Sequence, residues 1–128
     1  MPKLILIVDD SQVVRRLVRA CLESKLEQVT CTEATDGLEA IEHVKKVKPD
    51  LIVLDASMPV MNGMAAAPVL HNIVPQAPII LFTLHKDILS EKNAMDLGIR
   101  AVVSKMDQIE VLVDQISNLT PIARATAH

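Results

Sequence analysis

The stretch of sequence that decides the fold is PDLIVLD, residues 49–55. Four apolar residues, Leu51 to Leu54, lie between polar or turn residues, and this pattern predicts a short strand that is buried on both faces. A strand of this kind is typical of a parallel sheet with helices on each side. Asp55 follows the strand directly, and in such sheets ligands bind beyond the carboxyl ends of the strands. The search for a site therefore begins at this aspartate.

Similar patterns on either side of this stretch predict four more strands and five helices. Further apolar strands are expected at residues 4–8, 79–82 and 101–103, and an alternating, half-buried edge strand at 28–33. Apolar side chains at helical spacing predict helices after Ser11, around 38–44, at 64–74, at 86–97 and at 109–119. Asp107 and Glu110 are the expected capping pair of the last helix. This alternation predicts an α/β fold in which right-handed crossovers cover a five-stranded parallel sheet.

Composition sets the size of the protein and excludes several classes of ligand. The chain has 128 residues, 50% of them hydrophobic and 23% charged, which suits one domain with a substantial core. Phe82 is its one aromatic residue, so the chain lacks the rings that stack on nucleic-acid bases or flavins. A net charge of -3 argues against a surface that grips a phosphate backbone. No apolar run is long enough for a membrane span or signal peptide, and the expected location is the cytoplasm.

Polar residues follow four of the five predicted strands. Asp9 and Asp10 come after the first, Asp55 after the third, Thr83 after the fourth and Lys105 after the fifth. Because the carboxyl ends of parallel strands share one edge of the sheet, these side chains are expected to meet there. Three carboxylates repel one another unless a cation lies between them, and an all-oxygen set suits Mg²⁺. The second strand, which ends at Glu33, shows no obvious contribution to this site.

These residue types suit the chemistry of an aspartyl phosphate. One carboxylate attacks a phosphoryl group while a metal ion neutralises the developing charge. Lys105 is expected to hold a phosphoryl oxygen by its charge, and the Thr83 hydroxyl to donate a hydrogen bond to another. Taken singly, an aspartate after a strand is more often a helix cap or turn residue. Five suitable residues at the ends of four strands favour the functional interpretation.

Over about residues 3–119, the sequence resembles the response-regulator receiver domain of two-component signalling. The resemblance is carried by IVDDS at 7–11, ATDGLEA at 34–40, PDLIVLD at 49–55, MPVMNG at 58–63, Thr83 and Lys105. It implies a flavodoxin-like, doubly wound fold with strand order 2-1-3-4-5. It also implies a receiver domain over residues 1–120, with 121–128 as a tail or the start of a linker.

The resemblance gives each residue at the sheet edge a role. Asp55 is the implied phosphoacceptor, which takes a phosphoryl group from a sensor histidine kinase or a small phosphodonor. Mg²⁺, or Mn²⁺ in its place, would be bound by Asp10, Asp55 and the backbone carbonyl of Ser57, with Asp9 acting through a water molecule.

Other positions are implied to bind the phosphoryl group or to tune its removal. Thr83 and Lys105 would hold the phosphoryl oxygens and carry the switch. Ser57 and His85 occupy positions that tune dephosphorylation in the family, although His85 is equally well explained as an ordinary loop histidine.

Three residues depart from the family pattern near the end of the predicted sheet. Val102 stands where most receivers have an aromatic residue, Met106 stands where many have a proline in a cis peptide, and Leu84 replaces a small residue. A trans bond or a local rearrangement is therefore expected before Met106, because cis bonds at other residues cost several kcal/mol. These departures leave the phosphorylation residues intact and affect how a signal would spread. Met106 also fits receivers of the NarL-like DNA-binding subgroup.

The leading hypothesis is a phosphorylation switch that changes the surface seen by an output domain or downstream protein, with no turnover enzyme activity beyond its own phosphorylation and slow dephosphorylation. The alternatives are a receiver that docks without phosphorylation and, less favoured, an aspartyl-phosphate hydrolase. No direct contact with nucleic acid or membrane is expected, whereas a homodimer formed on phosphorylation is left open. Arg15, Arg16 and Arg19 are interpreted as a solvated face of the first helix.

Overall fold

The computed structural model describes residues 2–85, 87 and 89–125 and contains one parallel sheet of five strands. The order across the sheet is β2-β1-β3-β4-β5, as predicted. The strands are β1 (Lys3–Val8), β2 (Val29–Ala34), β3 (Leu51–Leu54), β4 (Ile79–Thr83) and β5 (Ile99–Ser104). Chain order and sheet order differ because the chain returns to the middle of the sheet after β2. Because all five strands run parallel, their carboxyl ends share one edge of the sheet.

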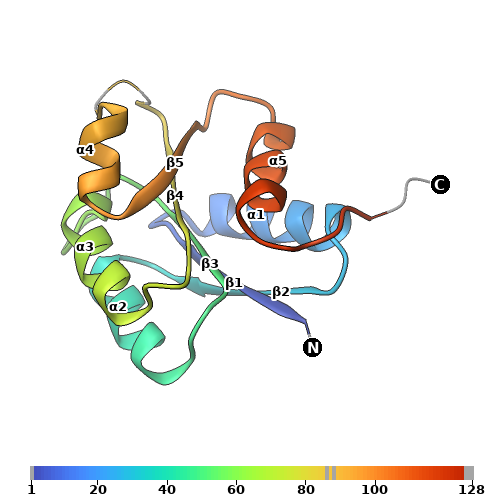
Figure 1. The fold of residues 1–128 in the computed structure, drawn as a ribbon, viewed down its shortest axis with the longest axis horizontal. Helices are drawn as coiled ribbons and strands as arrows, with labels where there is room; N and C mark the ends of the chain where they lie inside the picture. The colour runs from blue at the N-terminus through green and yellow to red at the C-terminus, as the bar shows by residue number, and fades with distance from the viewer. Residues whose placement is uncertain (1, 86, 88, 126–128) are drawn as a thin grey trace.

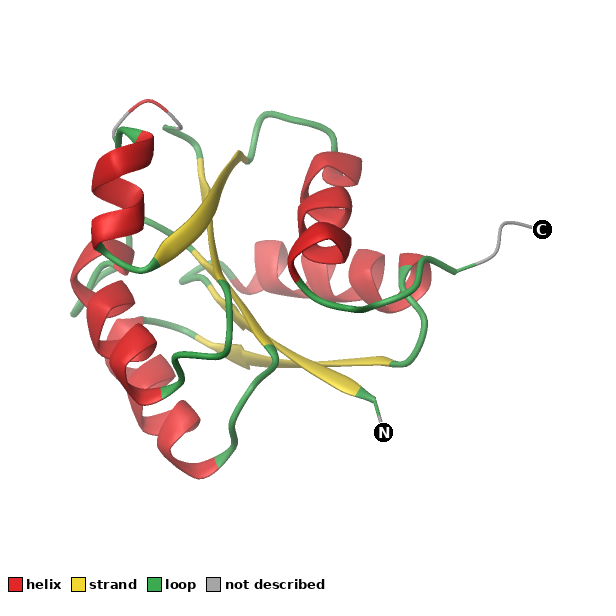
Figure 2. Cartoon of the chain, viewed as in Figure 1, coloured by secondary structure: helices red, strands yellow, loops and turns green. Residues whose placement is uncertain are grey.

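Helices cover both faces of this sheet (Figures 1 and 2). α1 and α5 lie on one face, whereas α2, α3 and α4 lie on the other. The helices are α1 (Gln12–Lys25), α2 (Gly37–Lys46), α3 (Gly63–Ile73), α4 (Glu91–Asp96) and α5 (Ile109–Leu119). Within the described residues, no helix is long and apolar enough to cross a membrane.

The two faces of the sheet carry separate apolar clusters because successive strand side chains point in opposite directions. On β1, Leu6 and Val8 pack toward α2 and α3, whereas Ile5 and Ile7 pack toward α1 and α5. All four are essentially inaccessible to solvent. Burial on both sides makes the register of β1 rigid, so the position of the residue after Val8 is fixed as well.

Local features of the helices differ from what the sequence patterns suggest. The apolar residues Leu17 of α1 and Leu38 of α2 are 62% and 48% exposed. The predicted cap of α5 at Asp107 is wrong, because the helix begins after Gln108, which makes no capping hydrogen bond through its side chain. The N–H of Asp107 instead donates to the Ser104 carbonyl in a turn that follows β5. Among the described residues, α4 is also shorter than the predicted 86–97.

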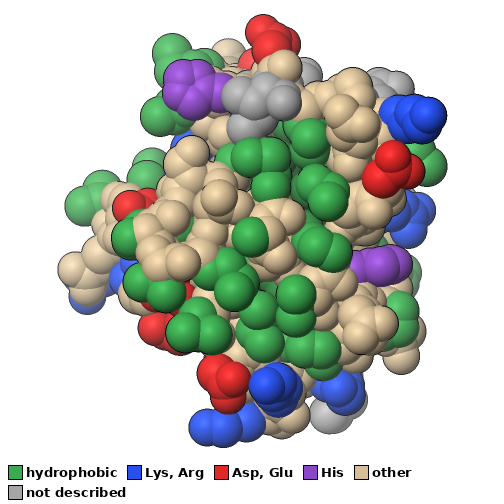
Figure 3. Space-filling view, turned by 90° about the vertical axis from the view of Figure 1, so that its left-hand side faces the viewer, with side chains coloured by type: hydrophobic (Ala, Val, Ile, Leu, Met, Phe, Trp, Pro, Cys, Tyr) green, Lys and Arg blue, Asp and Glu red, His purple; other side chains and the backbone are tan. Residues whose placement is uncertain are grey.

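Apolar side chains remain exposed on the face formed by α2, α3 and α4, where Figure 3 shows many of them together. α3 begins at Gly63 and includes Pro68, and its exposed positions Ala65, Pro68 and Val69 carry no charge. Met95 of α4, which is 71% exposed, belongs to the same side of the molecule.

Residues 121–125 pack against the end of α1. Ile122 is buried among α1 and α5 side chains, and Arg124 forms an isolated antiparallel bridge with Leu26. The Arg124 guanidinium also pairs with Glu110 and Asp114 of α5. The expected tail or linker at 121–128 stays a prediction, and residues 126–128 lie outside the described part of the chain.

Candidate functional site

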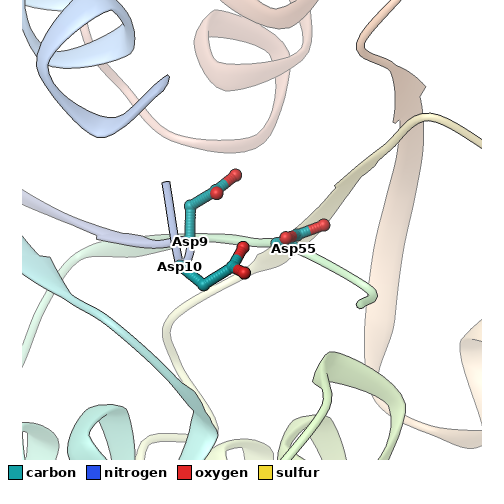
Figure 4. Close-up of side chains that lie close together, drawn as sticks. All are labelled: Asp9, Asp10 and Asp55. Carbon is teal, nitrogen blue, oxygen red and sulfur yellow. The ribbon is translucent and has the colours of Figure 1, made fainter. Parts of the chain in front are cut away.

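Three aspartates meet at the carboxyl ends of the two central strands, β1 and β3 (Figure 4). Val8 pairs with Leu54, and the N–H of Asp55 donates to the Val8 carbonyl at 2.9 Å, so the residues after both strands lie side by side. One carboxylate oxygen from each of Asp9, Asp10 and Asp55 lies within 4.8 Å of the others. Three hard oxygen donors at this spacing, one of them on an exposed side chain, fit a partly hydrated divalent cation such as Mg²⁺.

Lys105 connects the end of β5 to this acidic cluster. Its Nζ lies 2.7 Å from Asp9 Oδ2 and 3.3 Å from Asp55 Oδ1, and its side chain is only 15% exposed. Burial alone would lower the pKa of Lys105, but the hydrogen bond that its ammonium donates to Asp9 and the charges of Asp9 and Asp55 outweigh burial and raise the pKa. Lys105 is therefore a fixed positive charge between two buried carboxylates. Its ammonium also lies 5.9 Å from the centre of the Phe82 ring.

The Asp55 carboxylate is held in a dry and negatively charged environment. Burial, and then the charge of Asp9, raise the pKa of Asp55, while Lys105 and a weak hydrogen bond from the Ser57 N–H oppose them in part. That N–H lies 3.4 Å from Asp55 Oδ1. The net pKa is raised, so the site favours an added positive charge or a neutral form of Asp55.

Thr83 completes the edge of the site from β4. It is 2% exposed, and its Oγ1 accepts a hydrogen bond from the His85 N–H at 3.2 Å. The Lys105 N–H donates to the Thr83 carbonyl at 2.8 Å, which ties the ends of β4 and β5 together. A hollow of about 500 Å³ exposes this edge to solvent. It is lined by Asp9, Asp10, Ser11, Val14, Asp55, Ser57, Thr83, Leu84, His85 and Lys105.

Every residue predicted for the site lines this hollow, although the residues differ in their contacts. Ser57 and His85 lie at its exposed rim, and their backbone N–H groups contact Asp55 and Thr83 respectively. Leu84 belongs to the rim and is 57% exposed. No cis peptide bond occurs in the described ranges, so the bond before Met106 is trans.

The loop between β3 and α3 folds back onto the strand that carries Asp55. The N–H of Gly63 donates to the Ala56 carbonyl at 3.0 Å, and Asn62 caps α3 through a bond from the Ala65 N–H. A Cβ on Gly63 would lie 2.0 Å from the Asp55 carbonyl oxygen. Only glycine fits this contact, which explains physically why the loop needs a residue without a side chain there.

Sequence reasoning missed a second polar network behind Asp9. Arg15, predicted to face solvent, is buried; its Nη1 donates to the Asp9 carbonyl at 2.7 Å, and its Nε donates to Glu33 at 2.9 Å. Glu33 at the end of β2 thus reaches the site indirectly and also binds Arg19 at 3.0 Å. Burial by itself raises the pKa of Glu33, but its bonds from Arg19 and Arg15 outweigh burial and lower the pKa. No local pattern in the sequence signalled this network, because its contacts depend on how α1 packs against β2.

Residues 5–117 match the family model of the response regulator receiver domain. The chain is a response regulator receiver domain. It therefore belongs to two-component signalling, as the motifs had indicated. The receiver domain is 34% identical over 119 residues to the chemotaxis protein CheY of Halobacterium salinarum, and the match covers 93% of this chain and 98% of that protein.

Longer relatives and solved structures agree with this assignment. A protein-glutamate methylesterase/protein-glutamine glutaminase of Methanococcoides burtonii is 37% identical over 102 residues, which are 78% of this receiver domain but 29% of that protein. The receiver domain thus spans less than a third of that relative. The Thermotoga maritima response regulator TrrA, solved in complex with Mg(2+)-BeF, has a TM-score of 0.82 at 27% identity, covering 91% of this chain and 98% of that one.

Proposed function

We propose that Asp55 is the residue at which this receiver domain is phosphorylated, and that the domain acts as a phosphoryl-accepting switch. The observation that carries the proposal is the position of Lys105, whose Nζ lies within 3.3 Å of Asp55 and 2.7 Å of Asp9 at the open carboxyl edge of the sheet. A buried nucleophile is thereby placed beside a fixed cation and a buried hydroxyl, that of Thr83. These are the groups that a phosphoryl acceptor requires.

In the proposed reaction, an Asp55 carboxylate oxygen attacks the phosphorus of the donor. The bond from phosphorus to the donor's leaving atom breaks, and the leaving group departs with the electron pair and takes up a proton from solvent. The new bond is a mixed anhydride between the Asp55 carboxyl and the phosphoryl group. Lys105 and the Thr83 hydroxyl stabilise the phosphoryl oxygens, because both line the same hollow as Asp55, at the ends of β5 and β4.

The same proposal assigns Mg²⁺, or Mn²⁺, to the acidic cluster. Asp10, Asp55 and the Ser57 backbone carbonyl would bind the ion directly, with Asp9 acting through a water molecule. A bound divalent cation supplies charge neutralisation for the incoming phosphoryl oxygens. Asp10 is the exposed member of the cluster, which suits an ion that keeps several water ligands.

The phosphodonor and the target are inferred more broadly from the family. A sensor histidine kinase in the cytoplasm is the proposed donor, and the phosphorylated surface is read by an output domain or a separate protein. A response regulator of the LuxR family from Aurantimonas sp. SI85-9A1 has a TM-score of 0.83 at 28% identity, with 98% of this chain and 90% of that one covered. This likeness supports a NarL-like DNA-binding regulator as the parent of the domain. Slow dephosphorylation tuned by Ser57 and His85 belongs to the same proposal.

The experiment is intact-mass spectrometry after incubation with phosphoramidate or acetyl phosphate and Mg²⁺. The expected result is the addition of one phosphoryl group to the parent, absent when EDTA is present during the incubation and absent from Asp55→Asn. Asp50→Asn is the matched control, since Asp50 lies at the opposite end of β3 and accepts from the Leu4 N–H. A folded parent that gains no mass with either donor, or with a histidine kinase, contradicts the proposal and favours a receiver that docks without phosphorylation.

A further inference from the structure

We infer that Arg15, held by Glu33, is a positioning residue that sets the direction of the Asp10 carboxylate through the Asp9–Asp10 peptide. The inference rests on the proposed function, because it concerns how the acidic cluster is prepared to bind a divalent cation. Arg15 is on α1 and Glu33 is near the end of β2, so two elements outside the acidic cluster support the Asp9–Asp10 peptide.

The Arg15 guanidinium is buried, and burying a guanidinium costs free energy. Arg15 is 9% exposed, and a buried charge is tolerated only when it is paired and hydrogen-bonded. Its Nε donates to Glu33 Oε1 at 2.9 Å, and its Nη1 donates to the Asp9 carbonyl oxygen at 2.7 Å. The pKa of Glu33 is lowered by its two arginines, so the pair stays ionised at neutral pH. A fully satisfied cation is thus fixed against one backbone oxygen.

The backbone oxygen that Arg15 contacts is the carbonyl oxygen of Asp9. The Asp9 carbonyl belongs to the peptide that joins Asp9 to Asp10, just beyond the last residue of β1. The other polar groups of Asp9 are also bonded: its N–H to the Ala34 carbonyl, Oδ1 to the Ser11 N–H and Oδ2 to Lys105. Arg15 is therefore the partner that fixes the plane of the Asp9–Asp10 peptide on its carbonyl side.

Asp10 is exposed and is one of the proposed direct metal ligands. Its side chain departs from the peptide that Arg15 orients, and Figure 4 shows that side chain extending toward Asp55. Residues that orient metal ligands through hydrogen bonds commonly change metal affinity 10- to 100-fold when they are lost, roughly. Arg15 acts in the same way through the backbone rather than through a side chain.

The test compares Arg15→Met with Arg19→Met, using the Mg²⁺ dissociation constant from isothermal titration calorimetry. Methionine keeps the apolar stem but removes the guanidinium. Arg19 also binds Glu33, but it is 40% exposed at the side chain and no bond to the Asp9 carbonyl is formed by it. We expect Arg15→Met to weaken Mg²⁺ binding about tenfold and Arg19→Met to change it less than about twofold.

A second readout uses no metal. In the metal-free protein, the ¹⁵N–¹H resonances of Asp10 and Ser11 are expected to move in Arg15→Met and to stay in place in Arg19→Met. If Arg15→Met fails to fold, Arg15→Lys replaces it, because lysine keeps the charge but cannot bind Glu33 and the carbonyl in the same forked geometry. The same shifts and an intermediate loss of affinity are expected for this variant.

Two results would overturn the inference. One is unchanged Mg²⁺ affinity in the folded Arg15 variant, which would mean that Arg15 only links α1 to β2 through Glu33. The other is an equal loss in Arg19→Met, which would assign the effect to the Glu33 network as a whole. A parent that binds no Mg²⁺ and accepts no phosphoryl group is a different outcome, since it contradicts the proposed function itself.

Discussion

The two halves of the site are constructed differently. At the ends of β1 and β3, every polar group of Asp9 has a hydrogen-bond partner, and Gly63 packs directly on the backbone of Asp55. At the ends of β4 and β5, exposed apolar side chains lie directly after Thr83 and Lys105: Leu84 is 57% exposed and Met106 is 79% exposed. The acidic half is therefore rigid and intolerant of change, whereas the β4–β5 half is open to solvent apart from Thr83 and Lys105.

This difference suggests that the acidic half carries the proposed chemistry, whereas the β4–β5 half presents the surface that a partner would contact. Asp9 and Asp55 are tied to neighbouring strands by their backbone N–H groups, which donate to the Ala34 and Val8 carbonyls. The departures from the family pattern, Leu84, Val102 and Met106, all belong to the other half. Rigid, buried groups hold reacting atoms in place, whereas exposed groups contact partners. We therefore expect mutations in the acidic half to change stability and phosphorylation much more than mutations in the β4–β5 half.

The largest effect is expected for Gly63→Ala in the acidic half. The new methyl group would lie 2.0 Å from the Asp55 carbonyl oxygen, so the loop or the strand must move. We expect a loss of roughly 4 kcal/mol in the free energy of unfolding, at the upper end for overpacking. Urea titration followed by far-UV circular dichroism measures it. Gly37→Ala is the control, and about half the loss is expected there because its closest contacts are at 2.8 Å. An equal loss of stability in Gly63→Ala and Gly37→Ala would contradict the claim that the acidic half is the more rigid part of the site.

The next effect concerns Lys105, which joins the two halves. Lys105→Met leaves two buried carboxylates without their cation, and we expect a loss of roughly 2 kcal/mol at pH 7 in metal-free buffer. Added Mg²⁺ should restore part of it, because a divalent cation replaces the missing charge. Lys25→Met, which removes an exposed pair with Glu110, should have a much smaller effect, because solvent screens that pair. Similar losses in both variants would contradict the special position of Lys105.

A pH series tests the electrostatics of Asp55. Its raised pKa means that the folded protein holds this proton more tightly than the unfolded chain does. Metal-free stability should therefore fall as pH rises from the ordinary value of 3.8 to the raised one, and this loss should be absent from Asp55→Asn. The stability difference between the variant and the parent should grow over that interval and close again with Mg²⁺. A difference that is independent of pH would contradict the assigned cause.

A stabilising change is expected in the loop beside the site. Val60 has φ of 68° and is 79% exposed, which is an unfavourable conformation for a β-branched residue with nothing to pack against. Val60→Gly should raise the free energy of unfolding by roughly 1 kcal/mol in the same urea titration. Val69→Gly, in the middle of α3, should lower it by a similar amount. A loss of stability in Val60→Gly would show that the valine side chain has a packing role.

The smallest effects are expected at the exposed positions of the β4–β5 half. Leu84→Ala and Met106→Ala should each change stability by less than about 0.5 kcal/mol, because both side chains are largely in solvent. Phosphorylation by phosphoramidate should continue in both variants, as followed by intact mass. A large loss of stability or of phosphorylation would mean that this half also supports the chemistry.

Sequence patterns predicted the parts of the molecule in which hydrophobic period and strand ends determine position. The five strands and the strand-end residues Asp9, Asp55 and Lys105 belong to this group, because apolar runs mark the strands and parallel pairing aligns their ends. Arg15 and Glu33 were not predicted, because charged residues on an amphipathic helix and an edge strand normally face solvent. The burial of Arg15 and its contact with Glu33 depend on the packing of α1 against β2, which no local pattern encodes.

Two smaller differences between the sequence patterns and the structure, at Asp107 and Leu17, also arise from tertiary packing. The cap expected at Asp107 fits a local rule, but the turn that follows β5 uses the N–H of that residue for a bond to Ser104. Leu17 falls near the apolar stripe of α1, yet the helix is oriented so that Val18 and Leu22 are buried and Leu17 is left exposed. In both cases tertiary packing outweighed local preference.

The most direct test of the central claim is to find which residue carries the phosphoryl group. Borohydride reduces an acyl phosphate to a primary alcohol and releases phosphate, so a phosphorylated aspartate becomes homoserine. Peptide mass spectrometry of the reduced, Mg²⁺-phosphorylated parent is predicted to find homoserine at position 55 and intact aspartate at Asp9 and Asp10. Homoserine at Asp9 or Asp10, or phosphate on another side chain with Asp55 unchanged, would contradict the account.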